Sequence, residues 1–278
     1  METVVPEPQP LQSAARIGLE DRVAVVIPAR LASQRLPRKV LADIAGRPLL
    51  SWTAAMAGRS CAGPSNVFVA TGDAAVEQAA LGEGLQVLRT PVDLPSGTAR
   101  VAWASRLLPE DVRWVINVQA DEPLLDPAAI DAVVRVLADG RWDMATTVCA
   151  IAVDEWRSGE VVKAVVDRCG EARWFTRAPV PHRLIDLDDG RLEDALQGLP
   201  EVRRHLGVYG FDRSSLLRWG EAGGTAVAAL AGLEQLGALS AGWRIGAAFV
   251  DRPSGPAVDT PGDLLAVRRA LRDVNSMT

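Results

Sequence analysis

The chain has few of the residues that build metal clusters or disulfide frameworks. Its three cysteines are odd in number and lack the spacing of metal ligands, so we expect reduced thiols in a cytosolic protein. Its two histidines argue against a histidine-based zinc site. No apolar run approaches the length that spans a membrane, and the first twenty residues lack the basic start and apolar stretch of a signal peptide. These absences predict a cytoplasmic protein with no membrane partner.

A strongly basic character is absent as well. The net charge is −5 and the isoelectric point is near 5.2, which argues against a nucleic-acid partner. The basic cluster between Arg30 and Lys39 therefore stands out, and it favours a local anionic ligand. With 48% hydrophobic residues, a chain of 278 residues can form one large α/β domain or a domain with a subdomain.

The stretch that organises the chain begins with the β-branched run Val23–Ile27, which predicts a buried parallel strand ended by Pro28. In an α/β sheet, the loop after the carboxyl end of the first strand is a common ligand site. Here that loop carries cations and a hydroxyl, namely Arg30, Ser33, Arg35, Arg38 and Lys39. Guanidinium groups pair with phosphate oxygens and lysine acts as a point charge, so the loop suits a polyphosphate. On charge alone, a solvated basic connection is an equal alternative.

Strands and helices alternate through the first half of the chain, which predicts a doubly wound, mostly parallel α/β sheet of the Rossmann-like kind. The predicted strands there are Val23–Ile27, Asn66–Thr71, Leu85–Leu88 and Trp114–Val118, and the helices are Leu49–Ala57, Asp73–Leu81, Thr98–Leu107 and Pro127–Leu137. Strands dominate next, at Met144–Val153, Val161–Asp167, Ala172–Thr176 and Leu206–Phe211, with Leu184–Gly198 as a loop or short helix. The last predicted elements are helices Ser214–Trp219, Thr225–Leu236 and Pro261–Val274 and strand Trp243–Val250.

One aspartate is a candidate metal ligand by its position. Asp121 follows the predicted central strand, and a carboxylate past the carboxyl end of a strand, near a phosphate loop, is well placed to hold Mg²⁺. The alternative for Asp121 is a turn aspartate. Asp259 precedes the last predicted helix, where by position alone it would cap that helix. Asp263 is expected to be a structural carboxylate at the start of that helix.

The segment Pro28–Lys39 resembles the signature PAR-x-x-S-x-R-L-P-x-K of the cytidylyltransferases that activate sugar acids, above all the 3-deoxy-manno-octulosonate (KDO) cytidylyltransferases. The resemblance recurs in order at INVQADEPLL, RHLGVYGF, LEQL and VDTPGDL, and it covers about residues 22–273. An ordered set of motifs is far more specific than any one of them. The resemblance implies a nucleotide-diphospho-sugar transferase-like fold, with CTP and a small acidic acceptor as substrates and Mg²⁺ as cofactor.

The resemblance also implies a role for individual residues. It implies CTP contacts at Pro28, Ala29, Arg30, Ser33, Arg35, Lys39, Thr71, Ser96 and Gln119. It implies catalytic roles for Arg35, Lys39, Asp121 and Asp259, with the two aspartates as the magnesium ligands. It implies an acceptor pocket formed by Arg177, His205, Tyr209, Glu234 and Gln235, and Arg204 is a further anion-pairing candidate. From spacing alone, the alternatives are a strand residue with a satisfied hydroxyl for Tyr209 and a solvent-facing helix surface for Glu234 and Gln235.

Near the expected nucleotide site, the chain departs from the family pattern at a few positions. Ala120 stands where the family usually has glycine, which would strain the backbone if a positive φ is needed there. Gly72 replaces an aspartate of the family's A-T-D motif. Leu94 and Ala99 replace a histidine and an acidic residue around the Ser96-Gly97-Thr98 turn.

The acceptor half departs further. Ala228 and Ala231 replace two glutamates, and Pro181-His182-Arg183-Leu184 replaces Pro-Trp-Asp-Arg. We therefore expect an acceptor pocket that has lost acidic groups and gained His182. Such a pocket would suit an acceptor smaller or more anionic than an eight-carbon sugar acid.

The sequence predicts four segments. Residues 1–20 are a loose tail rich in Pro, Gln and Glu, and residues 21–142 form the nucleotide-binding part. Residues 143–212 form a smaller strand-rich subdomain for the acceptor, and residues 213–278 return to the nucleotide-binding part. In the resembled family the strand-rich subdomain, here residues 143–212, commonly forms a homodimer, so we expect one here.

These features predict a Mg²⁺-dependent cytidylyltransferase in which an oxygen of an acidic acceptor attacks the α-phosphorus of CTP. KDO is the acceptor by resemblance. The alternative acceptor is a phosphonate such as phosphonoformate, because the acceptor half is altered and lysine is scarce, with two among 30 basic residues, as in proteins of GC-rich genomes. A second alternative is a regulatory module that binds CTP without turnover, since a fold does not fix a function.

Overall fold

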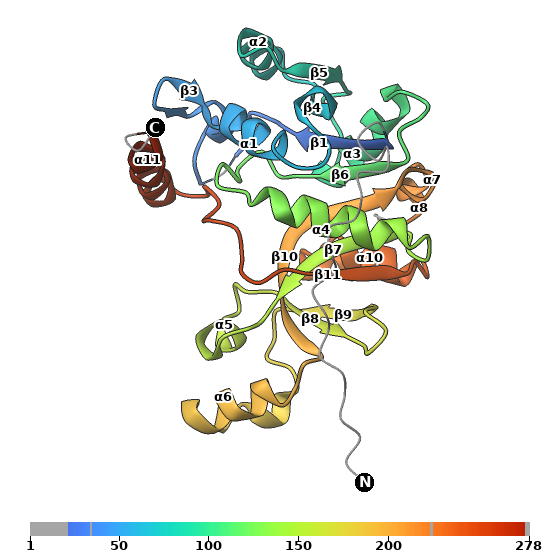
Figure 1. Ribbon diagram of the computed structural model, residues 1–278, viewed down its shortest axis with the longest axis vertical. Coiled ribbons are helices and arrows are strands. Elements are labelled where there is room, and N and C mark those ends of the chain that lie inside the picture. Colours follow the sequence, from blue (N-terminus) through green and yellow to red (C-terminus); the bar gives the residue numbers. More distant parts are fainter. Residues whose placement is uncertain (1–21, 34, 223–224, 276–278) are drawn as a thin grey trace.

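The computed structural model describes residues 22–33, 35–222 and 225–275 (Figure 1), so the predicted tail over residues 1–20 lies outside the described residues. The main sheet has the strand order β11-β7-β10-β6-β1-β4-β5. Its strands are β1 (Val23–Pro28), β4 (Val67–Thr71), β5 (Gln86–Arg89), β6 (Trp114–Asn117), β7 (Met144–Cys149), β10 (Val202–Asp212) and β11 (Ile245–Phe249). Along this path only β10 pairs antiparallel with its neighbours, β6 and β7. The predicted mostly parallel α/β sheet is therefore confirmed.

Helices cover both faces of this sheet. One face carries α1 (Leu49–Ala57), α2 (Ala74–Gly82) and α4 (Pro127–Ala138), and the other carries α3 (Gly97–Ala104), α8 (Trp219–Ala222) and α10 (Gln235–Ser240). Strand β1 alternates between the two layers. Val23, Val25 and Ile27 pack toward α1 and α4, whereas Ala24 and Val26 pack toward α3, and all five are fully buried. Because both faces of β1 are in the core, its carboxyl end is the part left open to a ligand.

A smaller lobe extends from the sheet at the bottom of Figure 1. Strands β8 (Lys163–Val166) and β9 (Ala172–Thr176) continue from β10, next to α5 (Val153–Arg157) and α6 (Asp189–Gln197). Trp156, Leu192 and Leu196 give this lobe a core of its own. Strands β7 and β10 are shared by the lobe and the main sheet, so the predicted boundaries at 142/143 and 212/213 stay a prediction.

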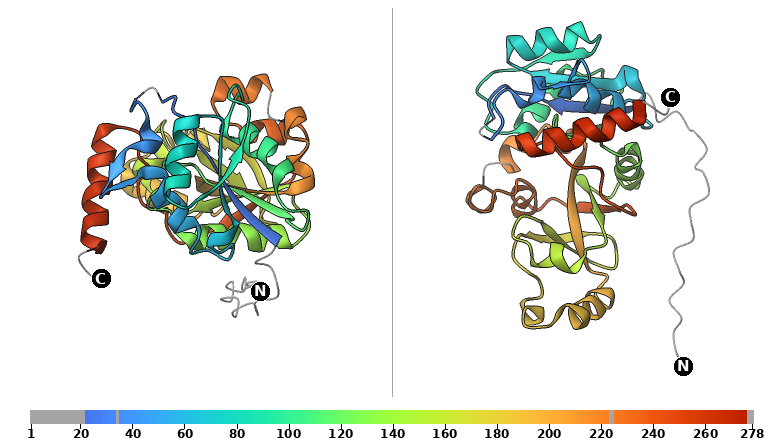
Figure 2. Two further views of the ribbon diagram at one scale, coloured as in Figure 1. Left: turned by 90° about the horizontal axis from the view of Figure 1, so that it is seen from above. Right: turned by 90° about the vertical axis from the view of Figure 1, so that its left-hand side faces the viewer.

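The last helix, α11 (Pro261–Asn275), lies along one side of the molecule (Figure 2). It packs on the start of α1 and on the hairpin of β2 (Asp43–Ile44) and β3 (Arg47–Pro48), where Val267 and Leu271 share a buried cluster with Ile44 and Leu49. Arg268 donates to the carbonyl of Asp43 at 2.9 and 2.6 Å. This packing brings the segment before α11 over the carboxyl end of β1.

Several predicted elements have different limits in the structure. The strand predicted over Met144–Val153 ends at Cys149, and Val153 begins α5. The helix predicted over Thr225–Leu236 is two helices, α9 (Ala226–Ala231) and α10, because the chain turns at Gly232 with a φ of +62°. The helix predicted over Ser214–Trp219 spans the end of α7 (Arg213–Leu216) and the start of α8, and the predicted loop or short helix before Gly198 contains α6.

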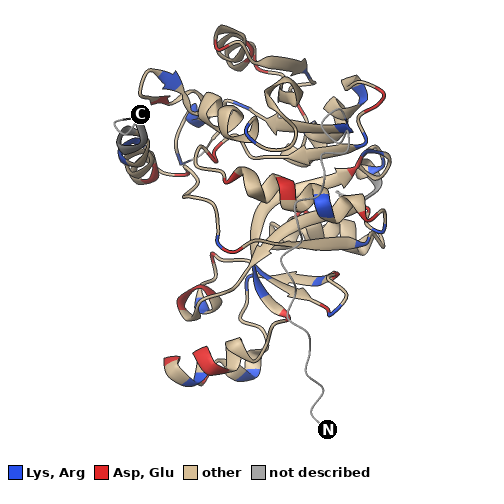
Figure 3. Ribbon diagram, viewed as in Figure 1, with Lys and Arg blue, Asp and Glu red and all other residues tan. Residues whose placement is uncertain are grey.

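Basic and acidic residues are mixed along most elements of the fold (Figure 3). Within the described residues, no helix combines the length and the apolar character needed to cross a bilayer. The three cysteines are unpaired.

Candidate active site

A cavity of about 300 Å³ opens at the carboxyl end of β1. Eight of the predicted nucleotide and metal residues line it: Pro28, Arg30, Ser33, Arg35, Lys39, Gln119, Asp121 and Asp259. They come from the loop after β1, from the segment after β6 and from the segment before α11. We call this space the nucleotide cavity. Ala29, Thr71 and Ser96 are not in its lining, and the first two are buried.

The two predicted metal-binding aspartates meet at the ammonium group of Lys39. Its Nζ lies 2.5 Å from Asp121 Oδ2 and 2.9 Å from Asp259 Oδ1, and Arg35 Nη2 lies 3.0 Å from Asp259 Oδ2. Burial lowers the pKa of Lys39, but the carboxylates of Asp121 and Asp259 raise it more, so the net pKa lies above its ordinary value. Lys39 therefore carries its charge between the two aspartates at neutral pH.

Backbone contacts hold Asp259 close to Asp121. The amide of Val258 donates to the carbonyl of Asp121 at 2.8 Å, and the amide of Gly255 donates to the carbonyl of Leu124 at 3.1 Å. Gly255 is needed for this approach, since a Cβ there would lie 2.5 Å from Leu124 Cβ. Two carboxylates that are far apart in sequence are thus joined through the main chain on either side of them.

Asp263 has the structural role expected of it. Its Oδ2 accepts from the backbone amides of Asp259 and Thr260 at 3.1 and 2.8 Å and from the Thr260 hydroxyl at 2.9 Å. The Thr260 side-chain bond first, and then the backbone bonds, hold the pKa of Asp263 below its usual range. Asp263 therefore fixes the turn that presents Asp259.

The alanine at position 120 is accommodated without strain. Among the non-glycine residues that the structure describes, Arg38 and Ala45 have left-handed backbone angles and Ala120 does not. Its carbonyl accepts from the Thr53 hydroxyl at 3.1 Å. A glycine is therefore not required here by backbone conformation.

A glycine is needed at position 72 because another chain segment approaches its backbone closely. A Cβ at this position would lie 2.8 Å from the carbonyl oxygen of Thr90 and 2.9 Å from Val92 N, so a larger residue would displace that segment. The following residue, Asp73, occupies the N-cap position of α2 but makes no side-chain cap bond there. Its Oδ2 instead accepts from the amide of Leu31 at 2.9 Å, which ties the basic loop to the end of β4.

The Ser96 hydroxyl is already used by the fold. It caps α3 by accepting from the amide of Ala99 at 3.1 Å. Beside it, the buried amide of Asn117 donates to Thr98 Oγ1 at 3.1 Å and accepts from Gln119 Nε2 at 3.2 Å. This chain of bonds orients Gln119, whose Oε1 lies 3.5 Å from the Cβ position of Gly97.

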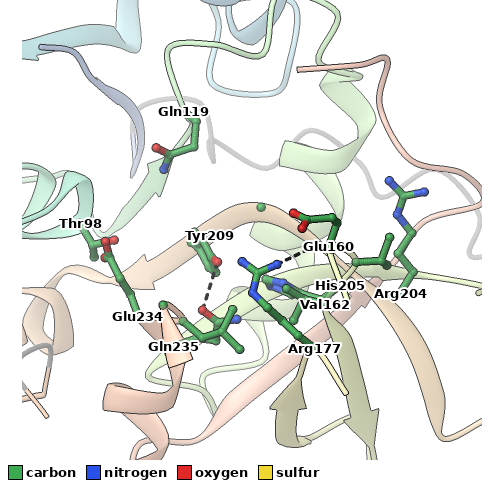
Figure 4. A pocket seen from close by; sticks show the side chains of 14 residues that line it. Thr98, Gln119, Glu160, Val162, Arg177, Arg204, His205, Tyr209, Glu234 and Gln235 are labelled. Atoms are coloured by element: carbon green, nitrogen blue, oxygen red, sulfur yellow. Dashed lines mark hydrogen bonds between the residues drawn. The ribbon is translucent and has the colours of Figure 1, made fainter. Parts of the chain in front are cut away.

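A second cavity, of about 390 Å³, adjoins the first and shares Gln119 with it (Figure 4). All five predicted acceptor residues line it, namely Arg177, His205, Tyr209, Glu234 and Gln235, and so does Arg204. They come from three different parts of the chain: Arg177 follows β9, His205, Tyr209 and Arg204 are on β10, and Glu234 and Gln235 are at the start of α10. We call this space the acceptor cavity.

Sequence reasoning missed part of this lining. Thr98, Glu160, Val161 and Val162 also face the cavity (Figure 4). The expectation that the pocket gained His182 is wrong, because His182 is exposed on a short 3-10 helix outside the cavity. Glu160 and Glu234 line the cavity, and the expected loss of other acidic groups stays a prediction. Ala228 and Ala231 are not in the lining either.

Several polar groups of the acceptor cavity are buried, among them His205 and Gln235. Burial lowers the pKa of His205 to about 3, so its ring is neutral. Its Nε2 lies 2.9 Å from Thr146 Oγ1, and that hydroxyl also lies 3.0 Å from the Val208 carbonyl. With the hydroxyl donating to the carbonyl, Nε2 is the ring nitrogen that donates and Nδ1 is free to accept.

Tyr209 has a raised pKa, and Glu234 has an unpaired carboxylate oxygen. Burial, and then the negative charges of Glu234 and Glu122, raise the pKa of Tyr209, whose hydroxyl donates to Gln235 Oε1 at 3.3 Å. Glu234 Oε2 and Gln235 Nε2 are buried and find no hydrogen-bond partner among the described residues. Buried polar atoms are normally paired, so an acceptor and a donor here are available to a ligand.

Glu122 is a further polar group that sequence reasoning did not assign. It follows Asp121 and lies near β10, where its Oε1 is 3.5 Å from the Cβ position of Gly207. Burial, and then the neighbouring charge of Asp121, raise its pKa to about 7. The acidic pair in the DEP motif gave a signal for it, but only the fold shows that it lies beside the acceptor cavity.

Comparison with known proteins agrees with this arrangement. The family model described as Cytidylyltransferase matches residues 24–245. The chain is 42% identical over 257 residues to a 3-deoxy-manno-octulosonate cytidylyltransferase of Acidovorax ebreus, covering 89% of this chain and 96% of that protein. It is 39% identical over 260 residues to the protein of the same name from Verminephrobacter eiseniae, covering 90% and 95%.

Among solved structures, the fold is similar to that of CMP:2-keto-3-deoxy-manno-octonic acid synthetase complexed with CTP. The TM-score is 0.80 at 30% sequence identity, and the match covers 91% of this chain and 99% of that one. An α/β sheet with a cationic loop and two aspartates at the end of its first strand defines a nucleotidyltransferase. With the family match over most of the chain, the conclusion is more specific: the chain belongs to the cytidylyltransferase family and is a CTP-dependent enzyme.

Proposed function

We propose that the protein is a Mg²⁺-dependent KDO cytidylyltransferase, which converts CTP and KDO to CMP-KDO and pyrophosphate. The observation that carries the proposal is the pair of adjoining cavities that share Gln119. The nucleotide cavity is cationic and suits a triphosphate. The acceptor cavity offers a guanidinium for a carboxylate and unpaired polar atoms for hydroxyl groups. The names of the relatives point to the same acceptor.

In the proposed reaction, an oxygen of the acceptor attacks the α-phosphorus of CTP in line. A bond forms between that oxygen and phosphorus, the bond from phosphorus to the pyrophosphate oxygen breaks, and the hydroxyl proton is released. Arg30, Ser33 and Lys39 would hold the triphosphate in the nucleotide cavity. Arg177 would hold the acceptor's carboxylate, with Gln119 between the two substrates. The enzyme thus works by positioning and by charge neutralisation, without a covalent nucleophile.

The residues at the nucleotide cavity fit a magnesium ion. Asp121 and Asp259 already hold one cation between them, since both contact Lys39 Nζ within 2.9 Å. Within the described residues, no third His, Cys, Asp or Glu joins them in a group. That matches Mg²⁺, which takes one or two carboxylates and completes its shell with phosphate oxygens and water. When bound, the ion would neutralise phosphate charge and orient the acceptor oxygen.

The acceptor cavity favours a sugar acid over a phosphonate. The buried Glu234 Oε2 lacks a donor among the described residues, and sugar hydroxyls supply donors. Phosphonoformate has no hydroxyl group apart from its acid groups, so at neutral pH it would place negative charge beside this carboxylate. Three of the substitutions in the acceptor half that motivated the phosphonate alternative, His182, Ala228 and Ala231, lie outside the cavity lining.

The test is pyrophosphate release from CTP and Mg²⁺, with KDO and phosphonoformate offered side by side. We expect release with KDO and none with phosphonoformate. Release with phosphonoformate alone would overturn the proposed acceptor. Silence with both, in a preparation that still binds CTP by calorimetry, would overturn it as well and direct the search to other hydroxy acids. UTP in place of CTP checks the base preference.

We also propose that the protein is a homodimer through the smaller lobe. Among the described strands, β9 pairs with β8 alone, and its Trp174 is 49% exposed. An open strand edge with a large exposed apolar side chain is suited to a contact between chains. Sedimentation equilibrium of the wild type and of Trp174→Glu tests this: a dimer that the substitution dissociates is expected, and a monomeric wild type contradicts it.

A further inference from the structure

Lys163 is a fully buried charged residue that the proposed reaction does not use. It is one of two lysines in the chain, and its side chain has no exposed surface. It begins β8, where it lies opposite Thr176 of β9 on one side and Arg204 of β10 on the other. A buried lysine is unusual unless its donors are paired, so its contacts reveal what it does.

All three donors of the Lys163 ammonium are matched by backbone carbonyl oxygens. Nζ donates to Ser158 at 2.5 Å, to Val161 at 3.0 Å and to Arg177 at 2.8 Å. Only the ammonium form supplies three N–H donors, and no other natural side chain offers them from one point. Lys163 therefore joins the segment of residues 158–161 to the end of β9.

Both segments that Lys163 joins line the acceptor cavity. Glu160, Val161 and Val162 come from one, and Arg177 comes from the other. A second bond joins the same two segments, because Arg177 Nη1 donates to the carbonyl of Glu160 at 2.8 Å (Figure 4). The backbone of Arg177 is thus held by Lys163, and its guanidinium is held by the segment that Lys163 fixes.

The segment that Lys163 fixes also contacts the backbone of another polar residue of the cavity. The amide of His205 donates to the carbonyl of Val162 at 2.9 Å, directly before Lys163 in the chain. A displacement of residues 158–162 would therefore move both the Arg177 guanidinium and the backbone of His205. Arg177 itself is exposed, so little besides these bonds limits the positions of its long side chain.

We propose that Lys163 is a positioning residue of the acceptor site, which fixes the segment of residues 158–162 against Arg177 and so aims the Arg177 guanidinium at the acceptor's carboxylate. The proposal rests on the proposed function, because it assumes that the acceptor is an anion bound in this cavity. Burial and the nearby charge of Arg177 lower the pKa of Lys163, which agrees with its enclosed place. Lys163 would not touch either substrate.

The first test is a steady-state comparison of Lys163→Met with the wild type. Methionine keeps most of the volume and removes the three donors. We expect the KM for the acceptor to rise roughly tenfold or more, with the KM for CTP changed less than about twofold, since hydrogen bonds from a charged group are lost on one side of the site only. A rise in both KM values alike would overturn the proposal.

A matched control separates positioning from general loss of stability. Leu192 is fully buried in the core of the smaller lobe and is absent from the acceptor lining. Leu192→Ala should lower the melting temperature while leaving the KM for the acceptor unchanged. An equal rise in that KM for Leu192→Ala would show that any loosening of the lobe has this effect, which would overturn a specific role for Lys163.

A double-mutant cycle shows whether Lys163 acts through Arg177. Arg177→Met should raise the KM for the acceptor by itself. Adding Lys163→Met to it should then change that KM by less than about twofold, because the group being positioned is gone. If the second substitution multiplies the KM by its full single-variant factor, Lys163 acts by another route and the proposal is wrong.

Amide hydrogen exchange on the wild type decides the case even if Lys163→Met fails to fold. The amides of residues 158–162 should be protected from exchange to the same extent with and without acceptor, because the bonds from Lys163 and Arg177 already hold this segment in the free protein. Protection that develops only with acceptor would mean that ligand binding orders the segment of residues 158–162, and would overturn the proposal. If no acceptor is turned over, the proposed function fails. The exchange experiment without ligand still shows whether the segment of residues 158–162 is held in place in the free protein.

Discussion

The nucleotide cavity and the acceptor cavity lie side by side but are built in different ways. The nucleotide cavity takes most of its cations from one loop, Arg30 to Lys39, and its aspartates are paired with those cations. The acceptor cavity takes its residues from the end of β9, from β10 and from the start of α10, and several of its polar groups are buried and neutral or unpaired. The first is held together by charge, the second by hydrogen bonds to the backbone.

The difference has a physical consequence for binding. A triphosphate carries several negative charges, so an open cationic loop can attract it and then adjust around it. A small sugar acid offers one charge and several hydroxyl groups, so discrimination depends on preplaced partners that stay unpaired without the correct ligand. We therefore expect substitutions in the two cavities to affect different kinetic constants.

The largest expected effect comes from removing either aspartate of the nucleotide cavity. Asp121→Asn and Asp259→Asn should each lower kcat by about a hundredfold to a thousandfold or more, because a carboxylate that would hold the magnesium is lost. Steady-state pyrophosphate release measures this. Asp139→Asn is the matched control, since Asp139 is exposed at the end of α4 and absent from the cavity lining, and activity should be retained. Near-normal kcat in both aspartate variants would contradict the metal assignment.

Glu234→Gln should affect the other cavity and leave the first one alone. The substitution removes the negative charge of a carboxylate whose buried Oε2 has no partner among the described residues and would accept from sugar hydroxyls. We expect the KM for the acceptor to rise roughly tenfold to a hundredfold, with the KM for CTP unchanged. Glu193→Gln, an exposed glutamate of α6, is the control and should behave as the wild type. Equal changes in both KM values would show that the two cavities are not independent.

The contrast between the cavities also explains what could be predicted from the sequence. The nucleotide cavity was predictable because its cations follow one buried strand, and a parallel strand opens its carboxyl end to ligands. The β-branched apolar run Val23–Ile27 was sufficient to place the loop. The meeting of Asp121 with Asp259 was predictable only through the family resemblance, because the bonds that join their segments run from Val258 and Gly255 to a stretch far away in the chain.

The acceptor cavity was only partly predictable, for a related reason. Tyr209 and Glu234 were found by resemblance, but the role of Glu160 depends on a carbonyl contact with Arg177 that no sequence pattern encodes. The His182 expectation was wrong because the substituted turn packs outside the cavity. The break at Gly232 was missed because apolar periodicity continues on both sides of a single left-handed residue.

His205 gives the acceptor cavity a pH-dependent contribution to stability. Its pKa is about 3 in the folded protein and about 6.5 when unfolded. The unfolded state therefore binds more protons between these values, and the stabilisation is present above pH 6.5 and lost as the pH falls. From pH 7 to 5 the wild type should lose about 2 kcal/mol through this residue.

Urea unfolding of the wild type and of His205→Asn at both pH values measures this loss. Glu122, with its raised pKa, acts in the opposite direction and is common to both proteins, so only the difference between them reports on His205. A difference that does not change with pH would contradict a buried neutral ring.

The smallest expected effect concerns the cation that Lys39 places between Asp121 and Asp259. A positive charge at this point should compete with a divalent metal for the same oxygens, so Lys39→Met should bind Mn²⁺ without CTP roughly tenfold more tightly than the wild type. Electron paramagnetic resonance of free Mn²⁺ measures this directly, apart from turnover. Arg38→Met is the control, because Arg38 is exposed and absent from the cavity lining. Unchanged Mn²⁺ affinity in Lys39→Met would mean that the Lys39 ammonium does not compete with a divalent ion for the oxygens of Asp121 and Asp259. The charge pairs of the nucleotide cavity would then not control metal binding.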